Sequence, residues 1–164
     1  MRAFGNPRKT AFSLVELVVV IVIIGIIAAM AIPRLSRGTA GAGDSALAGN
    51  LAIIRNAINL YSAEHNGAFP TQAKFTEQLT MYTSLTGAES ATRDAAHPYG
   101  PYLMSIPPCP VGDQTSPTAI DFDTSNSPPS VTADNGGWIY NPNTGDFVAN
   151  TNTTDSNSKA YNTY

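Results

Sequence analysis

The chain has 164 residues, of which 43% are hydrophobic, and its formal net charge is −3. That length allows a membrane segment and, beside it, one domain of at most ~100 residues. An acidic chain lacks the basic face that nucleic-acid phosphates require, so we predict no nucleic-acid partner.

The chain begins with a basic leader and continues as an apolar segment. Residues 1–11 hold three bases and no acid, and from Phe12 to Ile32 only Glu16 is charged. A helix over that segment spans roughly 31 Å at about 1.5 Å per residue, which is enough to cross a bilayer. Its β-branched residues would suit a strand in water, but a backbone in lipid must satisfy its own hydrogen bonds, so we predict a helix.

Glu16 is costly in such a helix. A lone carboxylate in a membrane segment costs about 2.5–3.5 kcal/mol on insertion scales, so it requires a cationic partner. The segment contains no basic side chain. Cutting the chain just before Phe12 would create an α-amine that supplies the missing charge.

The basic leader, a small residue and then Phe-Ser-Leu-Val-Glu-Leu together resemble the N-terminal signal of type IV prepilins and type II secretion pseudopilins. The resemblance implies that a membrane prepilin peptidase cuts between Ala11 and Phe12 and methylates the new amino terminus. It places Glu16 fifth in the mature chain, and Gly25 and Pro33 at two further positions that recur in the family. Ala11 stands where the family more often has Gly.

The resemblance also implies how the chain is divided. The expected parts are a leader peptide (1–11), a transmembrane and filament-core helix (12–33), an amphipathic helix half with a flexible glycine-rich start (34–66) and a C-terminal globular domain (67–164). The basic leader favours a cytoplasmic amino terminus by the positive-inside rule, although Arg34 and Arg37 on the far side weaken that bias, and the resemblance implies the same orientation. The chain is then expected to cross the bacterial inner membrane once, with its C-terminal domain in the periplasm, before it enters a periplasmic or cell-surface filament. Ordinary secretory cleavage after Ala31 is the alternative that the sequence leaves open.

The middle of the long helix is its weakest part. Pro33 has no amide hydrogen, so the carbonyl of Ala29 would lose its helical donor. Three glycines follow, beginning at Gly38, and each costs roughly 1 kcal/mol of helix propensity relative to Ala. We predict that the helix breaks between Gly25 and Gly43 when the chain is in a filament, at or near Gly25, Pro33 and Gly38.

Helical periodicity returns at residue 44. One apolar stripe recurs at steps of four and three, namely Leu47, Leu51, Ile54, Ile58 and Tyr61. Arg55 lies off this stripe and is expected to tolerate substitution. The dipeptide Asn66-Gly67 predicts the end of the helix, near His65. A helix with one apolar face requires a domain packed against it.

The remaining residues supply that domain. We predict a helix from about Gln72 to Ser84, a loop over 88–98 and an irregular, proline-braced crossing over 100–110. Residues 119–123 alternate like a strand, and residues 137–140 and 146–149 predict a hairpin. The tail, 151–164, is a strand end or a loose segment. The fold class that follows is α+β, a pilin fold in which a long N-terminal α-helix, membrane half plus amphipathic half, packs on a small antiparallel β-sheet domain.

Two short stretches of the C-terminal part carry a second resemblance. Gly-Pro-Tyr-Leu from Gly100 and Gly-Trp-Ile-Tyr-Asn-Pro from Gly137 are similar to the C-terminal region of major pseudopilins. Cys109 is the single cysteine, so no intrachain disulfide can form. Many major pilins carry a cysteine pair in this region, so its absence favours a pseudopilin.

Reactive side chains are few. His65, His97 and Cys109 lack metal-ligand spacing, and each is predicted to be a surface or loop residue. The sequence contains no nucleophile elbow, zinc-protease motif or phosphate-binding loop. We therefore predict a structural protein and not an enzyme.

A metal site is the remaining question about cofactors. Four aspartates could gather around Ca²⁺, as in the C-terminal loops of some major pseudopilins: Asp113, Asp121, Asp123 and Asp134. They do not fit an EF-hand loop, and flexible oxygen sites have no fixed spacing. Our prediction is a solvated acidic surface without a cofactor, with Ca²⁺ as the alternative.

The sequence therefore indicates a structural subunit of a type IV pilus-like or type II secretion pseudopilus filament. The implied partners are other copies in a homopolymeric filament, the prepilin peptidase, an inner-membrane assembly platform with minor pilins, and membrane lipid before assembly. The alternative is a membrane-anchored or secreted ligand-binding module that does not polymerise. That alternative gives Glu16 no role.

Overall fold

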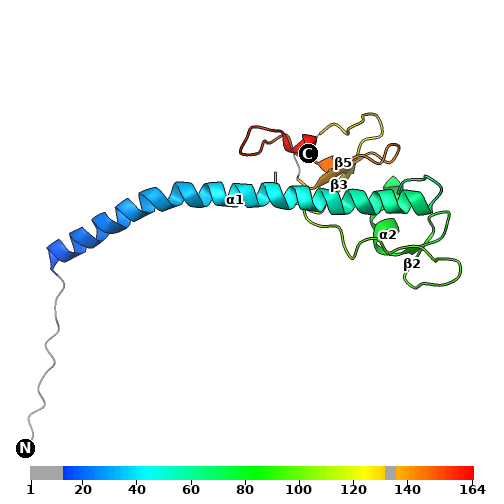
Figure 1. Cartoon of the computed structure of the whole chain (residues 1–164), viewed down its shortest axis with the longest axis horizontal. Coiled ribbons are helices and arrows are strands. Elements are labelled where there is room, and N and C mark those ends of the chain that lie inside the picture. The colour runs from blue at the N-terminus through cyan, green and yellow to red at the C-terminus, as the bar shows by residue number, and fades with distance from the viewer. Residues whose placement is uncertain (1–12, 132–135) are drawn as a thin grey trace, which may run out of the picture. The chain divides into compact units, whose positions relative to one another are not determined.

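The computed structural model describes residues 13–131 and 136–164, without the side chains of residues 32–40. Spatial contacts divide the chain into two units, Met1–Thr39 and Ala40–Tyr164. The helix α1 (Leu14–Glu64), drawn in Figure 1, belongs to both units. The boundary between the units falls within its glycine-rich stretch.

In the first unit the stretch Leu14–Ala31 of α1 is apolar except for Glu16. Leu14–Ala31 is long and apolar enough to cross a membrane, and none of it is buried within the protein. The α-helix continues through Gly25, Pro33 and Gly38 without interruption. Because the predicted break concerns the filament, it stays a prediction.

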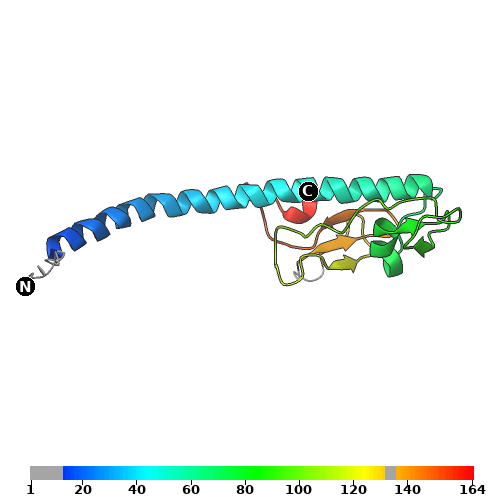
Figure 2. The ribbon, with the colours of Figure 1, turned by 90° about the horizontal axis from the view of Figure 1, so that it is seen from below.

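In the second unit α1 contributes one face to the hydrophobic core. The predicted stripe is confirmed, since all five of its residues are at most 2% exposed: Leu47, Leu51, Ile54, Ile58 and Tyr61. They pack against buried residues from α2 and the sheet, including Phe75, Leu79, Trp138, Tyr140 and Phe147. Figure 2 shows the domain on one side of this half of α1.

The end of α1 follows the sequence signal. Asn66 and Gly67 both adopt positive φ, of 56° and 85°, and the Gly67 amide donates to the carbonyl of Ser62 at 2.8 Å. A left-handed residue after the last turn is a common helix ending because it lets the chain satisfy carbonyls of that turn. The predicted stop is therefore confirmed.

The segment after α1 differs from the prediction at its end. A 3₁₀ turn, η1 (Gln72–Lys74), leads into α2 (Phe75–Thr80), and then β1 (Tyr82–Thr83) pairs antiparallel with β2 (Glu89–Ser90). The predicted helix to Ser84 is therefore too long, and the predicted 88–98 loop contains a strand. The backbone of Thr83 exchanges hydrogen bonds of 3.0 and 3.2 Å with Tyr99, a distant partner that helical periodicity does not reveal.

The second sheet is mixed. Its order is β3 (Ile120–Phe122), β4 (Trp138–Tyr140) and β5 (Phe147–Ala149). The predicted hairpin is confirmed, because β4 and β5 are antiparallel, with Tyr140 opposite Phe147. The pair β3–β4 is parallel, so the prediction of a purely antiparallel sheet is wrong for this pair. The connection from Phe122 to Trp138 is long enough to return the chain in the same direction, as a parallel pair requires.

The proline-braced crossing is ordered, as predicted. The amides of Tyr102 and Leu103 both donate to the carbonyl of Leu79 at 2.9 Å. Further along, the indole of Trp138 donates to the carbonyl of Pro107 at 2.9 Å. These bonds replace a regular ladder in holding the crossing against the core.

Two of the three reactive side chains, each predicted to be a surface or loop residue, are buried, although both lie outside the helices and strands. His65 is stacked on Tyr61 with ring centroids 3.8 Å apart, and its two nitrogens contact the Tyr61 carbonyl and the Thr83 hydroxyl. Cys109 lies in a loop as predicted, but it is fully buried, and burial raises the pKa of its thiol. His97 lies in a loop, where it contacts Asp94.

Candidate functional site

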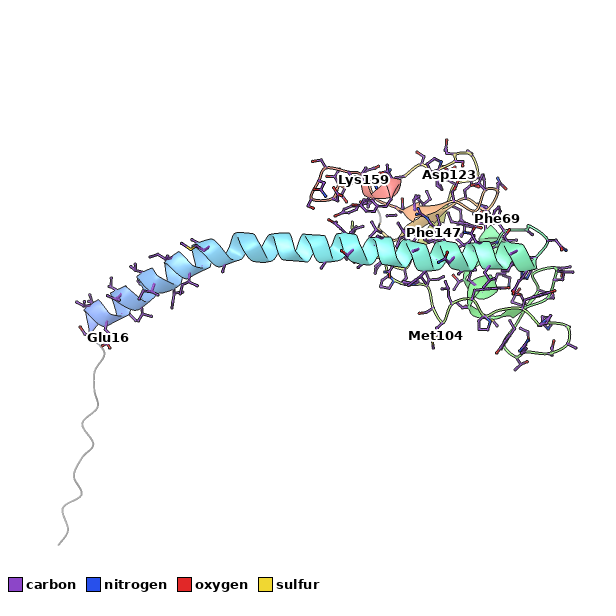
Figure 3. All side chains as sticks on the ribbon, viewed as in Figure 1. Glu16, Phe69, Met104, Asp123, Phe147 and Lys159 are labelled. Atoms are coloured by element: carbon purple, nitrogen blue, oxygen red, sulfur yellow. The ribbon has the colours of Figure 1, made fainter. Side chains whose placement is uncertain are left out.

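The candidate assembly site is at the start of α1. Glu16 lies in the first turn of the helix with its side chain exposed (Figure 3). Ser13 precedes the first helical residue and its carbonyl accepts the Leu17 amide at 3.1 Å, so the helix begins there. A carboxylate in the first turn is stabilised by the positive end of the helix dipole. The order Ser-x-x-Glu at this start is also the pattern of a capping box, a signal that the periodicity argument missed.

The partner proposed for Glu16 lies outside the described residues. Both Ala11 and Phe12, the residues on either side of the predicted cut, belong to that part. The cleavage, the methylation and the charge pair therefore stay predictions. Within Leu14–Ala31, which the structure describes throughout, Glu16 is the one charged side chain.

Two of the four candidate calcium ligands share a cavity. Asp113 and Asp121 both line a hollow of about 300 Å³, together with Thr115, Ser116 and Ala119. Asp113 Oδ1 accepts hydrogen bonds from the Thr115 hydroxyl and, at 2.8 Å, from the Thr115 amide, and these two bonds, the hydroxyl first, lower the pKa of the Asp113 carboxyl. Asp121 Oδ2 accepts the Asn150 side-chain amide at 2.6 Å.

The other two candidates do not join them in the described structure. Asp123 does not line that hollow, and its carboxylate instead accepts the Ser130 and Ser125 amides at 2.9 and 2.8 Å and the Asn126 side chain at 2.7 Å. These bonds, the Ser130 amide first, lower the Asp123 pKa to about 2. Asp134 lies outside the described residues. Among the residues that are described, no three His, Cys, Asp or Glu side chains are grouped to hold a metal, and the calcium site stays a prediction.

The attachment of the C-terminal tail to α1 is a structural feature that the sequence did not reveal. The tail forms a short loop closed by the bridge Thr154–Ala160 and ends in the 3₁₀ turn η2 (Tyr161–Thr163). The Tyr161 hydroxyl donates to Asp44 on α1 at 2.7 Å, and burial, with Asp44 next, raises the Tyr161 pKa to about 12. Of the two alternatives predicted for the tail, a strand end or a loose segment, the loose segment is therefore wrong.

A buried carboxylate organises this tail from within. Asp155 accepts the Lys159 amide at 2.8 Å and the hydroxyl of Tyr164, and the Tyr164 bond is the main cause that lowers the Asp155 pKa. The same bond raises the Tyr164 pKa to about 12. Lys159 lies over the Tyr164 ring, 3.9 Å from its centroid.

Arg55 provides the second attachment. Its guanidinium donates to the carbonyls of Phe147 at 3.0 Å and Tyr164 at 2.6 Å, and burial lowers its pKa. Arg55 is off the apolar stripe, as predicted, but it is half-buried and holds both β5 and the tail. We therefore no longer expect Arg55 to tolerate substitution, and expect instead that its loss destabilises the domain.

Comparison with known protein families identifies the signal at the N-terminus. Residues 6–32 match the family model described as the prokaryotic N-terminal methylation motif. The chain carries the prepilin-type signal of type IV pilins and pseudopilins. The motif indicates a type IV pilin-like protein that a prepilin peptidase processes, and the α+β architecture is consistent with a pilin fold. No curated protein and no solved structure matches the chain.

The match confirms the first resemblance. It includes Glu16 and Gly25 and ends just before Pro33. The second resemblance, of the C-terminal stretches to major pseudopilins, is not tested by this match and stays a prediction. Together with the apolar helix Leu14–Ala31, the motif fits anchoring of this pilin-like protein in the inner membrane.

Proposed function

We propose that this pilin-like protein is the structural subunit of a type IV pilus-like or type II secretion pseudopilus filament. The observation that carries the proposal is the combination of the methylation motif with a helix, Leu14–Ala31, that exposes its apolar side chains and a single carboxylate, Glu16. An apolar surface of this kind requires lipid or other copies of the helix around it. The prepilin peptidase is the partner that cuts between Ala11 and Phe12.

The charge pair provides the assembly mechanism. After the cut, the methylated amine of Phe12 and the Glu16 carboxylate of a neighbouring copy neutralise each other in a surrounding of low dielectric constant. Neither charge is then left alone in an apolar environment. An interface of this kind, repeated by a screw operation, does not close on itself, so copies form a fibre and not a ring.

The apolar helix is proposed to occupy two environments in turn, first the membrane and then the filament. The subunit resides in the inner membrane with its amino terminus in the cytoplasm and its C-terminal domain in the periplasm. An assembly platform and minor pilins then transfer it into a homopolymeric filament, in the periplasm or at the cell surface. Of the two filament types we favour the pseudopilus, because Cys109 is the single cysteine and the stretch from Gly137 is similar to major pseudopilins.

The decisive experiment is the mass of the purified protein and of its amino-terminal peptide. A chain that begins with N-methyl-Phe12 supports the proposal. A chain that begins at Ile32 contradicts it, because ordinary secretory cleavage would remove Glu16 and the whole apolar segment.

A further inference from the structure

A polar cavity lies where three segments of the second unit meet: the second half of α1, the β4–β5 turn and the C-terminal tail. We call it the tail cavity, and six of its polar lining residues are Arg55, Asn59, Thr144, Asp146, Asn162 and Thr163. All of its lining residues belong to the second unit, and Figure 1 shows the C-terminal turn beside β5. Its volume of about 320 Å³ is within the range of small-molecule sites, roughly 300–1,000 Å³.

Two opposite charges line the tail cavity without pairing with each other. Burial lowers the pKa of the Arg55 guanidinium and Asp146 raises it in part, so the Asp146 charge is near. In the described part of the chain these two side chains nevertheless form no ion pair, which would bring a nitrogen and an oxygen within 4.0 Å. Opposite charges that are close but unpaired in a cavity are typical of a ligand site.

Both charged groups are held in place by the protein and keep hydrogen-bonding capacity. Arg55 Nε donates to the Phe147 carbonyl at 3.0 Å and Nη2 to the Tyr164 carbonyl at 2.6 Å, and a guanidinium has five N–H groups in all. Asp146 Oδ2 accepts the hydroxyls of Ser127 and, at 2.7 Å, of Thr144, whereas Oδ1 accepts from no described residue. A site fixed in this way loses little freedom when a ligand binds.

Asn162 supports the same conclusion independently. Its side-chain oxygen Oδ1 is buried without a hydrogen-bond partner among the described residues. Its Nδ2 has no partner there either, and it is not one of the fully buried atoms, so it is accessible from the cavity that Asn162 lines. Polar side chains inside proteins are normally hydrogen-bonded, so an amide without any bond requires a reason. A ligand in the tail cavity would provide a partner for Nδ2.

The charges of the lining restrict the class of ligand. A free anion would be repelled by Asp146 and a free cation by Arg55, so the ligand has no net charge. The Nε–Nη2 edge of Arg55, which could bind a carboxylate through two bonds, is already occupied by carbonyls. The lining offers single donors and single acceptors, and a hydroxyl group can meet both because it donates one bond and accepts others.

We propose that the tail cavity binds a neutral polyol, a sugar of monosaccharide size. Its hydroxyls accept from Arg55 and Asn162 and donate to Asp146. Pro128 and Val148, which also line the cavity, provide apolar contact for the carbon–hydrogen faces of the ring. The inference goes beyond the proposed function and does not depend on it, since every residue it uses belongs to the second unit.

The first test measures sugar binding to the purified full-length chain by saturation-transfer NMR. The chain is kept in a zwitterionic detergent, because detergents with sugar head groups would compete, and micelles without protein are the blank. The probes are D-glucose, D-galactose, D-mannose and N-acetyl-D-glucosamine, all uncharged. We expect at least one of them to bind saturably with a dissociation constant of about 1 mM or less. No saturable binding of any of the four up to about 10 mM would overturn the proposal.

Glycine tests the assignment of the ligand class. It is uncharged overall, like a sugar, but carries a carboxylate and an ammonium group that could bind Arg55 and Asp146. Binding of glycine without binding of any of the four sugars would overturn the proposal of a polyol. Sugar binding that glycine does not displace supports it.

The second test removes one contact without disturbing the fold. Asn162→Ala should weaken sugar binding about fivefold, because one hydrogen bond to the ligand is lost. The control is Asn152→Ala, an exposed residue of the same tail that does not line the cavity, and it should bind as the unaltered chain does. Neither side chain makes a hydrogen bond in the described structure, so both variants should keep the melting temperature. Equal sugar affinities of the two variants would show that any binding occurs elsewhere and would overturn the proposal.

Discussion

In the first half of α1, Val20 and Ile24 are 41% and 59% exposed, whereas in the second half Leu51 and Ile54 are at most 1% exposed. Both halves belong to one uninterrupted helix, so the difference does not come from secondary structure. Leu14–Ala31 in the first half is apolar except for Glu16, and none of it is buried within the described structure. The second half confines its large apolar residues mainly to one stripe, which its own domain covers. Stability of the domain and the proposed assembly of the filament therefore depend on different residues of the same helix.

The largest loss of stability is expected from a substitution within the apolar stripe that the domain covers. Ile54→Asp buries a carboxylate without a partner, which should cost more than about 4 kcal/mol and unfold the domain. The control is Ile53→Asp, one position along the helix and half-exposed, which should leave the thermal unfolding of the domain nearly unchanged. If circular dichroism showed both variants melting alike, the assignment of the two faces would be wrong.

The second effect concerns assembly alone. Glu16→Leu removes the carboxylate that is proposed to neutralise the Phe12 amine of another copy. We expect cleavage and membrane residence to continue, while filament yield falls at least tenfold, equivalent to about 1.4 kcal/mol or more. The measurement is filament yield by electron microscopy in cells without the wild-type copy. A normal yield would remove the charge pair from the mechanism.

A third, smaller effect distinguishes the residues of the second half of α1 that stabilise the domain from those that do not. Arg55→Ala should destabilise the domain by about 2 kcal/mol, because two backbone carbonyls lose a charged donor in a half-buried site. Asn56→Ala, the next residue and exposed, should change stability by less than about 0.5 kcal/mol. Equal losses in urea unfolding would show that Arg55 does not hold the tail.

These comparisons also show how far sequence reasoning reaches. The stripe from Leu47 to Tyr61 and the β4–β5 hairpin were predictable, because each depends on periodicity or on a turn between neighbours in the chain. The methylation motif was predictable because its residues have fixed spacing. The bond between Asp44 and Tyr161 joins residues 117 positions apart, and that pairing is set only when the domain is packed. The same holds for the parallel pair β3–β4 and for the burial of His65.

A fourth prediction concerns acid stability of the loop that follows β3. The pKa of Asp123 is lowered from 3.8 to about 2 because the folded loop donates hydrogen bonds to the carboxylate. The stabilisation is therefore complete above the unfolded value and is lost as the pH falls from about 4 towards 2. Carbon-detected NMR of the carboxyl group should show the low pKa, and Asp123→Asn should remove that acid-dependent step. A titration midpoint near 3.8 would contradict the bonding of this loop.

The smallest effect is expected from calcium. If Asp113 and Asp121 formed a site with Asp134, Ca²⁺ at a hundred times its dissociation constant would stabilise the domain by about 2.7 kcal/mol, or about ten degrees. An acidic surface without a site would gain only about a degree by screening, and Mg²⁺ would act almost as well. We expect this second outcome, because Asp121 already accepts a hydrogen bond from Asn150 and Asp123 lies in a separate loop. A shift near ten degrees that is specific to Ca²⁺ and absent from Asp121→Asn would contradict it, and would show that a metal adds to the core that the stripe on α1 provides.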